Sequence, residues 1–239
     1  PEAGMADYRL YAGKPVVIKP KSTNFGLGIT ILKHNYDETD FKAALQIAFE
    51  HDNTVLIEKF IPGREFRIFI INDEVVGILH RVPANVTGDG VLNIGQLIDM
   101  KNEDPLRGKG YRTPLEKIRK GREEEMFLKQ QGMDFNTVPK EREVVYLREN
   151  SNISTGGDSI DFTDDIDDSY KAIAVEAAKA LNVKITGLDM MIQDIHAPAT
   201  PDNYAIIEMN FNPAIHIHCY PFKGKNRHLN HKMIKALGF

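Results

Sequence analysis

Near its C-terminal end the chain carries the stretch Ile206-Ile207-Glu208-Met209-Asn210-Phe211-Asn212-Pro213. Glu208 and Asn210 are two residues apart, so on a β-strand both side chains project from the same face. A second apolar run, Gly187-Leu188-Asp189-Met190-Met191-Ile192, has Asp189 where its neighbours predict a buried apolar residue. Because a carboxylate in a buried strand is unfavourable unless it is paired or binds a cation, the two runs indicate a polar site on neighbouring strands.

The residue types at this site suit a hard divalent cation. Two carboxylates and an amide oxygen form an all-oxygen ligand set of the kind that Mg²⁺ prefers, with water and phosphate oxygens as its remaining ligands. Asp189, Glu208 and Asn210 are therefore candidate metal ligands. The alternative is that Asp189 caps a turn and that Glu208 pairs with a nearby lysine.

A second candidate site lies near the start of the chain, where Lys19 ends a short apolar run and precedes a loop of small polar residues, 22–28. Backbone N–H groups of such a loop can surround a phosphate while the lysine neutralises it. The loop is not a Walker A sequence, and Gly26-Leu27-Gly28 lacks the third glycine of a dinucleotide-binding fingerprint. An ordinary hairpin loop with a solvated lysine is the alternative.

A third candidate is the stretch Leu56-Ile57-Glu58-Lys59-Phe60-Ile61-Pro62-Gly63-Arg64-Glu65-Phe66. A strand that leads into a Pro-Gly turn, with polar groups among apolar ones, can form a hinge whose backbone bonds the edge of a purine. A carboxylate close by would hold the ribose hydroxyls. Taken alone, the same pattern is more typical of a simple hairpin.

The order of elements predicts an α+β fold with mainly antiparallel sheets. Apolar runs predict strands at residues 16–18, 29–32, 54–61, 65–71, 75–80, 144–148, 184–194 and 204–211. Helical spacing predicts helices from residue 40 (with Thr39 or Asp40 as N-cap), at 93–101 and 115–131, from the acidic cluster at 164–168 to near 181, and at 230–237.

Composition limits the classes of function. The chain has 239 residues and a net charge of −4, which argues against nucleic-acid and membrane-surface binding. No apolar run approaches the roughly 20 residues that span a bilayer. The single cysteine, Cys219, excludes an intrachain disulfide and favours a reducing, cytoplasmic location. The first residues lack Met and any signal-peptide pattern, and we expect a piece of a longer polypeptide.

Together and in this order, the three candidate sites resemble the ATP-grasp superfamily of carboxylate–amine ligases. The resemblance implies two subdomains of mainly antiparallel sheet with flanking helices, residues 1–71 and 72–239, and a nucleotide between them. It assigns Lys19 to a phosphate and the loop with Gly26 and Gly28 to the triphosphate of ATP.

The same resemblance assigns the remaining candidates. The adenine would lie on the hinge of Glu58, Lys59, Phe60 and Ile61, and the ribose on Glu65. Asp189, Glu208 and Asn210 would hold two magnesium ions, for which Mn²⁺ can substitute.

Longer stretches of sequence resemble one subgroup of this superfamily in particular. Arg81-Val82-Pro83-Ala84-Asn85-Val86-Thr87-Gly88-Asp89-Gly90 and Leu147-Arg148-Glu149-Asn150-Ser151-Asn152-Ile153-Ser154-Thr155-Gly156-Gly157 are similar to cyanophycin synthetases and to bifunctional glutathione-forming enzymes. The ending, from Asn212-Pro213-Ala214-Ile215-His216-Ile217-His218-Cys219-Tyr220-Pro221 to Lys223-Gly224-Lys225-Asn226-Arg227, is most similar to the C-terminal module of the latter. By the same resemblance, we expect the N-terminal ligase domain of that family and the first part of its grasp module to lie outside this sequence.

This resemblance implies a ligase that joins γ-glutamylcysteine and glycine through an acylphosphate and releases ADP and phosphate. Its expected partners are the two substrates and a glutamate–cysteine ligase domain of the same polypeptide, and the resemblance allows a homodimer. Lys19, Arg148 and Asn152 would act in catalysis, the last two around the loop at residues 150–157. Otherwise Arg148 pairs with Glu149 or another acidic neighbour, and the loop is an ordinary turn.

Other readings remain open. The same scaffold could join aspartate and arginine, as in cyanophycin synthesis, or two D-alanines, or it could bind a nucleotide and only regulate. His216, His218 and Cys219 suggest zinc, but on a strand Cys219 would point away from the two histidines, which favours packing or substrate lining.

Overall fold

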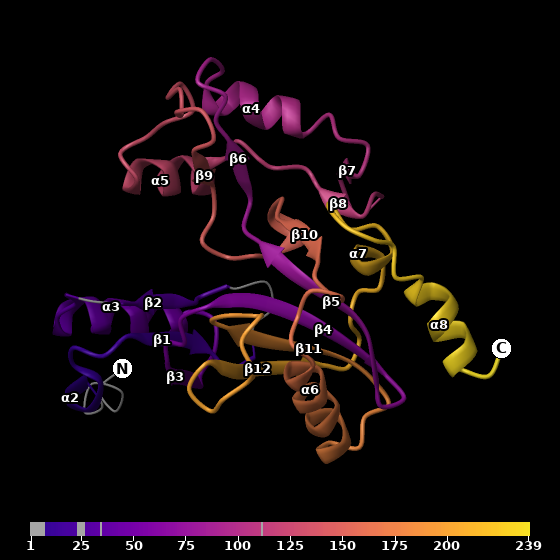
Figure 1. Ribbon diagram of the computed structural model, residues 1–239. Coiled ribbons are helices and arrows are strands. Elements are labelled where there is room, and N and C mark those ends of the chain that lie inside the picture. The colour runs from indigo at the N-terminus through magenta and orange to yellow at the C-terminus, as the bar shows by residue number, and fades with distance from the viewer. Residues whose placement is uncertain (1–7, 23–26, 34, 111) are drawn as a thin grey trace. The chain divides into compact units, whose positions relative to one another are not determined.

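The computed structural model describes residues 8–22, 27–33, 35–110 and 112–239, and the chain divides into two compact units, 1–62 and 63–239 (Figure 1). The expected division after residue 71 falls inside the second unit. The reason is strand β4 (Arg64–Ile71), which is hydrogen-bonded to β5 (Glu74–Val82) on one side and to β11 (Ile185–Ile192) on the other.

The first unit is a small antiparallel sheet with a helix packed on it. The strand order is β2 (Thr30–Leu32), β1 (Val16–Pro20), β3 (Val55–Lys59), and α3 (Glu38–Phe49) packs against the sheet after the short α2 (Tyr8–Tyr11). Apolar residues alternate along β1 and recur every third or fourth position along α3, so the two elements bury one shared core. Its fully buried members are Val16, Ile18, Phe41, Ala44, Leu45 and Ala48.

Helix α3 begins earlier than its apolar spacing predicts. Asp37 is the N-cap, because its carboxylate accepts hydrogen bonds from the backbone N–H groups of Thr39 (2.8 Å) and Asp40 (2.9 Å). The Asp40 carboxylate accepts in return from the Asp37 N–H (3.1 Å), which completes a capping box. The expected cap at Thr39 or Asp40 is therefore wrong.

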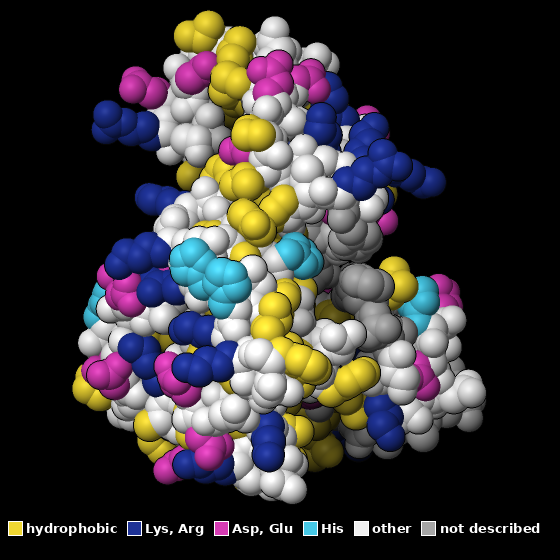
Figure 2. Space-filling model, turned by 90° about the vertical axis from the view of Figure 1, so that its right-hand side faces the viewer, with side chains coloured by type: hydrophobic (Ala, Val, Ile, Leu, Met, Phe, Trp, Pro, Cys, Tyr) yellow, Lys and Arg dark blue, Asp and Glu magenta, His cyan; other side chains and the backbone are white. Residues whose placement is uncertain are grey.

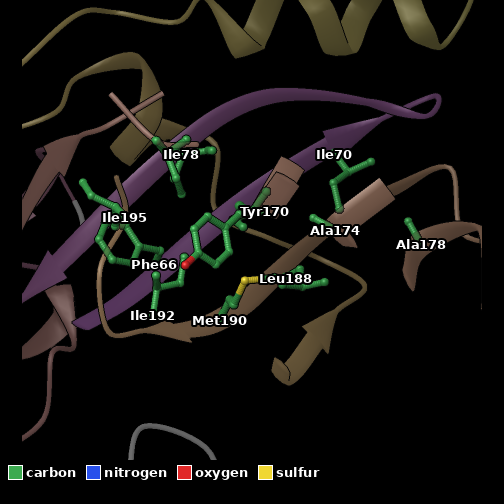
Figure 3. Packing of buried hydrophobic residues seen from close by; sticks show 12 residues of the cluster. Phe66, Ile70, Ile78, Tyr170, Ala174, Ala178, Leu188, Met190, Ile192 and Ile195 are labelled. Atoms are coloured by element: carbon green, nitrogen blue, oxygen red, sulfur yellow. The ribbon is translucent and has the colours of Figure 1, made fainter. Parts of the chain in front are cut away.

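The second unit contains the main sheet, five antiparallel strands in the order β10 (Asp158–Asp161), β5, β4, β11, β12 (Tyr204–Asn210). Helix α6 (Asp168–Ala180) covers one face, and Figure 3 shows how its side chains meet those of the sheet. The hydroxyl of Tyr170 donates to the carbonyl oxygen of Asp194 at 2.9 Å, so this buried polar atom is satisfied. The core comprises Phe66, Ile68, Ile70, Ile78, Ile166, Tyr170, Ala174, Ala178, Leu188, Met190, Ile192 and Ile195.

The opposite face of the sheet is covered in part by the C-terminal segment. Phe69, Ile71 and Val76 pack there with Cys219 of α7 (His216–Cys219) and Leu229 of α8 (Leu229–Ala236). Because successive side chains of a strand point to opposite faces, the same face of β4 also carries Glu65 and Arg67.

An insertion, residues 83–157, separates β5 from β10 in the sequence (Figure 1). It has an apolar core of its own. Its elements are β6 (Asn85–Thr87), α4 (Ile94–Lys101), β7 (Arg107–Gly108), β8 (Leu115–Glu116), α5 (Arg122–Gln130), β9 (Val144–Tyr146) and the 3₁₀ turn η1 (Ile153–Thr155). Strands β6 and β9 pair antiparallel, and β7 pairs with β8 in parallel. Its buried apolar residues are Ala84, Val86, Ile94, Leu97, Ile98, Ile118, Leu128, Val145 and Leu147.

The helix expected at residues 115–131 forms only in its second half. In the first half the backbone bonds neighbouring segments instead: the Lys117 N–H donates to the Gly108 carbonyl (2.8 Å), and the Ile118 N–H to the Asn102 side chain (2.8 Å). The strand expected around His216 is a short helix, α7. Within the residues that the structure describes, no helix is both long and apolar enough to cross a membrane.

The assignment of Asp37 as the N-cap of α3 in the first unit can be tested by mutation. We expect Asp37→Ala to lower the free energy of unfolding by about 1 kcal/mol, because two N–H groups at the start of α3 lose their acceptor. Thr39→Ala, in the same turn, should change it by less than about 0.5 kcal/mol. Urea unfolding followed by circular dichroism measures both, and a larger loss in Thr39→Ala than in Asp37→Ala would contradict the assignment.

Candidate functional site

The three metal-ligand candidates lie together on one face of the main sheet. The register of β11 and β12 pairs Asp189 directly with Glu208, and Gly187 with Asn210. Asn210 Nδ2 donates to Glu208 Oε1 at 3.1 Å. Asp189 is buried, whereas Glu208 is exposed. The site is thus one buried and one accessible carboxylate on adjacent strands, with an amide beside them.

Two arginines hold the buried carboxylate. Arg67, opposite Asp189 in the β4–β11 register, binds it with two groups, Nε to Oδ1 and Nη2 to Oδ2 (2.8 Å). Arg81 of β5 adds a third bond, Nη2 to Oδ2 at 2.9 Å. Burial alone would raise the pKa of Asp189, but the Arg67 hydrogen bonds and the Arg81 charge outweigh it and lower the pKa below its ordinary value. Asp189 is therefore ionised whenever the sheet is folded near neutral pH.

Glu65, the expected ribose ligand, belongs to the same network. Its carboxylate is ion-paired with Arg81 and accepts a hydrogen bond from Ser151 Oγ at 2.6 Å. The sequence interpretation missed the two arginines. The sequence did contain a signal for Arg67. Like Asp189, it is a charged residue within an apolar run, here Phe66 to Ile71, where its neighbours predict a buried apolar side chain.

The donor set fits a magnesium ion only in part. Among the described residues, no group of three or more His, Cys, Asp and Glu side chains is arranged to hold a metal ion. Asp189 and Glu208 with the Asn210 amide can supply at most three oxygen-bearing groups. Mg²⁺ is commonly held by one or two carboxylates plus waters and phosphate oxygens, so this small set fits a metal that arrives with a nucleotide.

In the first unit, Lys19 lies on the sheet beside a carboxylate. Its Nζ is 2.7 Å from Glu58 Oε2, and the side chains are 20% and 43% exposed, respectively. Both groups are accessible to solvent, so the pair can open to admit a phosphate. At Gly28 a Cβ would lie 2.7 Å from both the His51 and Pro20 side chains, and φ is +75°, so only glycine fits there. Gly26 lies outside the described residues.

The expected hinge is the end of β3 and the residues after it. The Phe60 N–H donates to the Pro15 carbonyl at 3.0 Å, and the Lys33 ammonium lies 5.4 Å from the centre of the Phe60 ring. Lys59 is exposed, and Ile61 is partly buried. The hydrogen bond to Pro15 therefore holds the backbone of Phe60 against the residue that precedes β1.

Arg148 is engaged by the first turn of α5. It pairs with Glu123 and donates through Nε to the buried Glu124 carboxylate at 2.6 Å. This matches the alternative in which Arg148 pairs with an acidic neighbour, although the partners are not Glu149. Asn152 precedes η1, and its carbonyl accepts from Thr155 Oγ1 (2.9 Å), so it shapes the loop at 150–157.

His216, His218 and Cys219 do not converge on a metal. His218 is fully buried, and neither ring nitrogen has a hydrogen-bond partner among the described residues. Its ring lies edge-on to Phe69, 5.4 Å between centres. Burial lowers the pKa of His218 to about 3, with smaller contributions that include the Arg67 charge. His218 is a neutral packing residue.

The sequence matches proteins of glutathione biosynthesis along its whole length. The chain is 62% identical over 239 residues to the bifunctional glutathione biosynthesis protein of Desulfotalea psychrophila and 57% identical over 231 residues to that of Clostridium perfringens. It spans about a third of the length of these relatives, 31% and 30%. In addition, residues 5–96 match the family described as "D-ala D-ala ligase C-terminus".

The fold matches a solved structure as well. The crystal structure of a bifunctional glutathione synthetase from Pasteurella multocida superposes with a TM-score of 0.73 at 48% identity. The match covers 99% of this chain and 32% of that one.

The Arg67–Asp189 pair can be tested by a double-mutant cycle. We expect Arg67→Met alone to cost about 3 kcal/mol in free energy of unfolding, because it leaves a buried carboxylate without its main partner. Arg67→Met/Asp189→Leu should cost less than Arg67→Met, since both charges are then removed. Urea unfolding without divalent cations measures the cycle, and strictly additive losses would show that the two groups do not interact.

The burial of His218 predicts a pH dependence. The unfolded chain takes up a proton near pH 6.5, whereas folded His218 does so only near pH 3. The free energy of unfolding should therefore fall as pH drops from about 6.5 towards 3, by about 1.4 kcal/mol per pH unit for this group. His218→Leu should make the slope shallower by that amount, whereas His196→Leu, at an exposed position, should not. Equal slopes in wild type and His218→Leu would contradict the assignment.

Proposed function

Because the chain has the ATP-grasp fold and belongs with the bifunctional glutathione biosynthesis proteins, of which it spans about a third, we propose that it is an ATP-dependent carboxylate–amine ligase. The proposed reaction joins the cysteinyl carboxylate of γ-glutamylcysteine to the amine of glycine. The observation that carries this proposal is the alignment of the entire chain with these relatives at 62% identity.

The proposed chemistry has two steps. A carboxylate oxygen of the dipeptide attacks the terminal phosphorus of ATP, and the bond to ADP breaks. The glycine nitrogen then attacks the acyl carbon of the resulting acylphosphate, loses a proton to solvent, and expels phosphate. Catalysis of phosphoryl transfer depends mainly on positioning and on neutralising charge.

The chain's own residues would divide this work. Glu208, Asp189 and Asn210 would hold magnesium, two ions in our proposal, with Mn²⁺ as a substitute. When bound, magnesium would shield the phosphate charges. Arg67 and Arg81 keep Asp189 ionised and oriented.

In the first unit, Lys19 would exchange Glu58 for a phosphate, and the loop before Gly28 would surround it. We assign the adenine to Glu58, Lys59, Phe60 and Ile61. Glu65 would accept the ribose hydroxyls in place of its present partners.

The loop at residues 150–157, with Asn152, would face the acyl group. Arg148 would help there only after releasing Glu123 or Glu124. We further propose that γ-glutamylcysteine comes from a glutamate–cysteine ligase domain fused to this chain in the longer protein.

The deciding assay is ADP release with Mg·ATP and three substrate sets: γ-glutamylcysteine with glycine, aspartate with arginine, and D-alanine alone. The chain is tested alone and within any longer polypeptide that carries it. Turnover only with the first set supports the proposal. Turnover with another set would retain the ATP site and overturn the substrates, and nucleotide binding without turnover would favour a regulatory role.

Glu208, the accessible carboxylate of the candidate metal site, is the position where a substitution tests the metal assignment most directly. Glu208→Gln keeps the shape but removes a charge, and we expect turnover to fall by about 10²–10³-fold, as when one preorganised electrostatic group is lost. Mn²⁺ binding, followed by water proton relaxation in the presence of ATP, should weaken in parallel. Glu176→Gln, on the exposed side of α6, is the matched control. Unchanged turnover and Mn²⁺ binding in Glu208→Gln would remove this residue from the metal site.

A further inference from the structure

The insertion carries a concentrated positive charge that the proposed mechanism does not use. Residues 107–122 contain seven cationic side chains and one carboxylate, in a chain whose net charge is −4. Strands β7 and β8 of this segment lie on the right in Figure 1, and Figure 2 faces that side, with Lys and Arg side chains projecting from the upper part. The cations are Arg107, Lys109, Arg112, Lys117, Arg119, Lys120 and Arg122.

Part of this segment borders a cleft of about 640 Å³. The other wall is the end of α4, which the Asn102 side chain ties to the segment through two 2.8 Å bonds to the backbone of Ile118. The residues that line the cleft carry charges of both signs: Asp99, Glu103, Lys109, Glu116, Lys117, Arg119 and Lys120.

Most of the cations in the cleft are available to a ligand. Lys120 is paired with Asp99 at 2.6 Å. Within the described parts of the chain, Lys109, Lys117 and Arg119 have no carboxylate at ion-pair distance. Unpaired cations around a concave surface attract anions and raise their local concentration.

The segment that forms the cleft contacts the loop at residues 150–157. Arg107, whose side chain is fully buried, donates from Nη1 to the carbonyls of Glu116 (2.8 Å) and Gly156 (3.0 Å). At Gly156, where φ is +95°, a Cβ would lie 2.7 Å from Ile118 Cα. The basic segment and the loop are therefore in direct backbone contact, and a side chain at position 156 would separate them.

The loop also contacts the carboxylate network of the main sheet. Ser151 Oγ donates to Glu65 at 2.6 Å, and Glu65 is paired with Arg81, which binds Asp189 at 2.9 Å. All of these residues belong to the second unit. The loop at residues 150–157 therefore contacts both the segment that forms the cleft and the carboxylate network of the candidate metal site.

We propose that the cleft lined by the end of α4 and by residues 109–110 and 116–120 binds a small peptide anion with two carboxylates and one ammonium group. Lys109, Lys117 and Arg119 would take the carboxylates, and Glu103 would take the ammonium. Both γ-glutamylcysteine and glutathione have this chemistry, and naming them rests on the proposed function. Capture here would raise the concentration of the peptide beside the loop at residues 150–157.

Isothermal titration calorimetry without nucleotide tests the cleft directly. The full chain is titrated with γ-glutamylcysteine, with reduced glutathione, and with glutathione diethyl ester, which lacks both negative charges. We expect the acids to bind at least about five-fold more tightly than the ester at 20 mM ionic strength, and to lose that advantage at 300 mM. Preference for the dipeptide identifies a substrate site, and preference for glutathione a product site.

Charge variants locate the binding. Lys109→Gln/Lys117→Gln/Arg119→Gln should weaken binding of the acids about five-fold or more. Lys129→Gln/Lys232→Gln/Lys235→Gln removes the same charge from exposed positions elsewhere and should change it less than two-fold. Equal losses in the two triple variants, equal binding of acid and ester, or no binding at low ionic strength would each overturn the proposal.

Because the titration needs no turnover, it separates this inference from the proposed function. A chain that binds the acids through the cleft but releases no ADP would overturn only the ligase proposal. A chain that turns over but binds acid and ester equally would overturn only the cleft.

Discussion

The ion pair between Arg67 and Asp189 is the interaction on which the candidate site depends. It joins β4, the central strand of the main sheet, to its neighbour β11 from positions directly opposite each other. A buried carboxylate is unfavourable by several kcal/mol without compensation, and a second arginine, Arg81, adds to the compensation from β5. The sheet can therefore keep a charged acid in its interior, next to the accessible Glu208, only because three strands each contribute a group.

The same constraint explains how the loop at residues 150–157 is anchored. Arg81 also binds Glu65, and Glu65 binds Ser151, so the charges that balance Asp189 extend to the loop. Hydrogen bonds to charged groups are worth about 1.5–3 kcal/mol, more than neutral ones. A loop held in this way has a defined position relative to β4, β5 and β11. A change in the charge of Asp189 should therefore alter the hydrogen bonding of Ser151 through Arg81 and Glu65.

The sequence predicted the strands well where their apolar runs are unbroken, because burial on both faces leaves few alternatives. It failed where side chains compete for the backbone. Asp37 caps α3 ahead of the first apolar residue, and Asn102 bonds the backbone of Ile118 and keeps it out of a helix. Both contacts depend on the geometry of one side chain, which apolar spacing does not describe.

For the site, spacing predicted that Glu208 and Asn210 share a face, and the strand register adds Asp189 directly opposite Glu208. It did not predict the arginine partners, because each comes from a different strand. Arg148 illustrates the same limit. Its partners, Glu123 and Glu124, are about 24 residues away and are brought near only by the start of α5.

The joint between the insertion and the main sheet is also polar, and this has a structural consequence. Asp158, at the start of β10, is paired with Arg107 and Lys101, and both cations lie over the Phe222 ring at 5.5 and 5.2 Å. Burial lowers the pKa of Lys101, although the Asp158 charge opposes the shift. The insertion and the sheet have separate apolar cores, so this group of charges sets how one is held on the other. Because ion pairs specify direction where apolar contacts do not, they hold the basic cleft beside the loop, although no apolar cluster of the described residues spans the two parts.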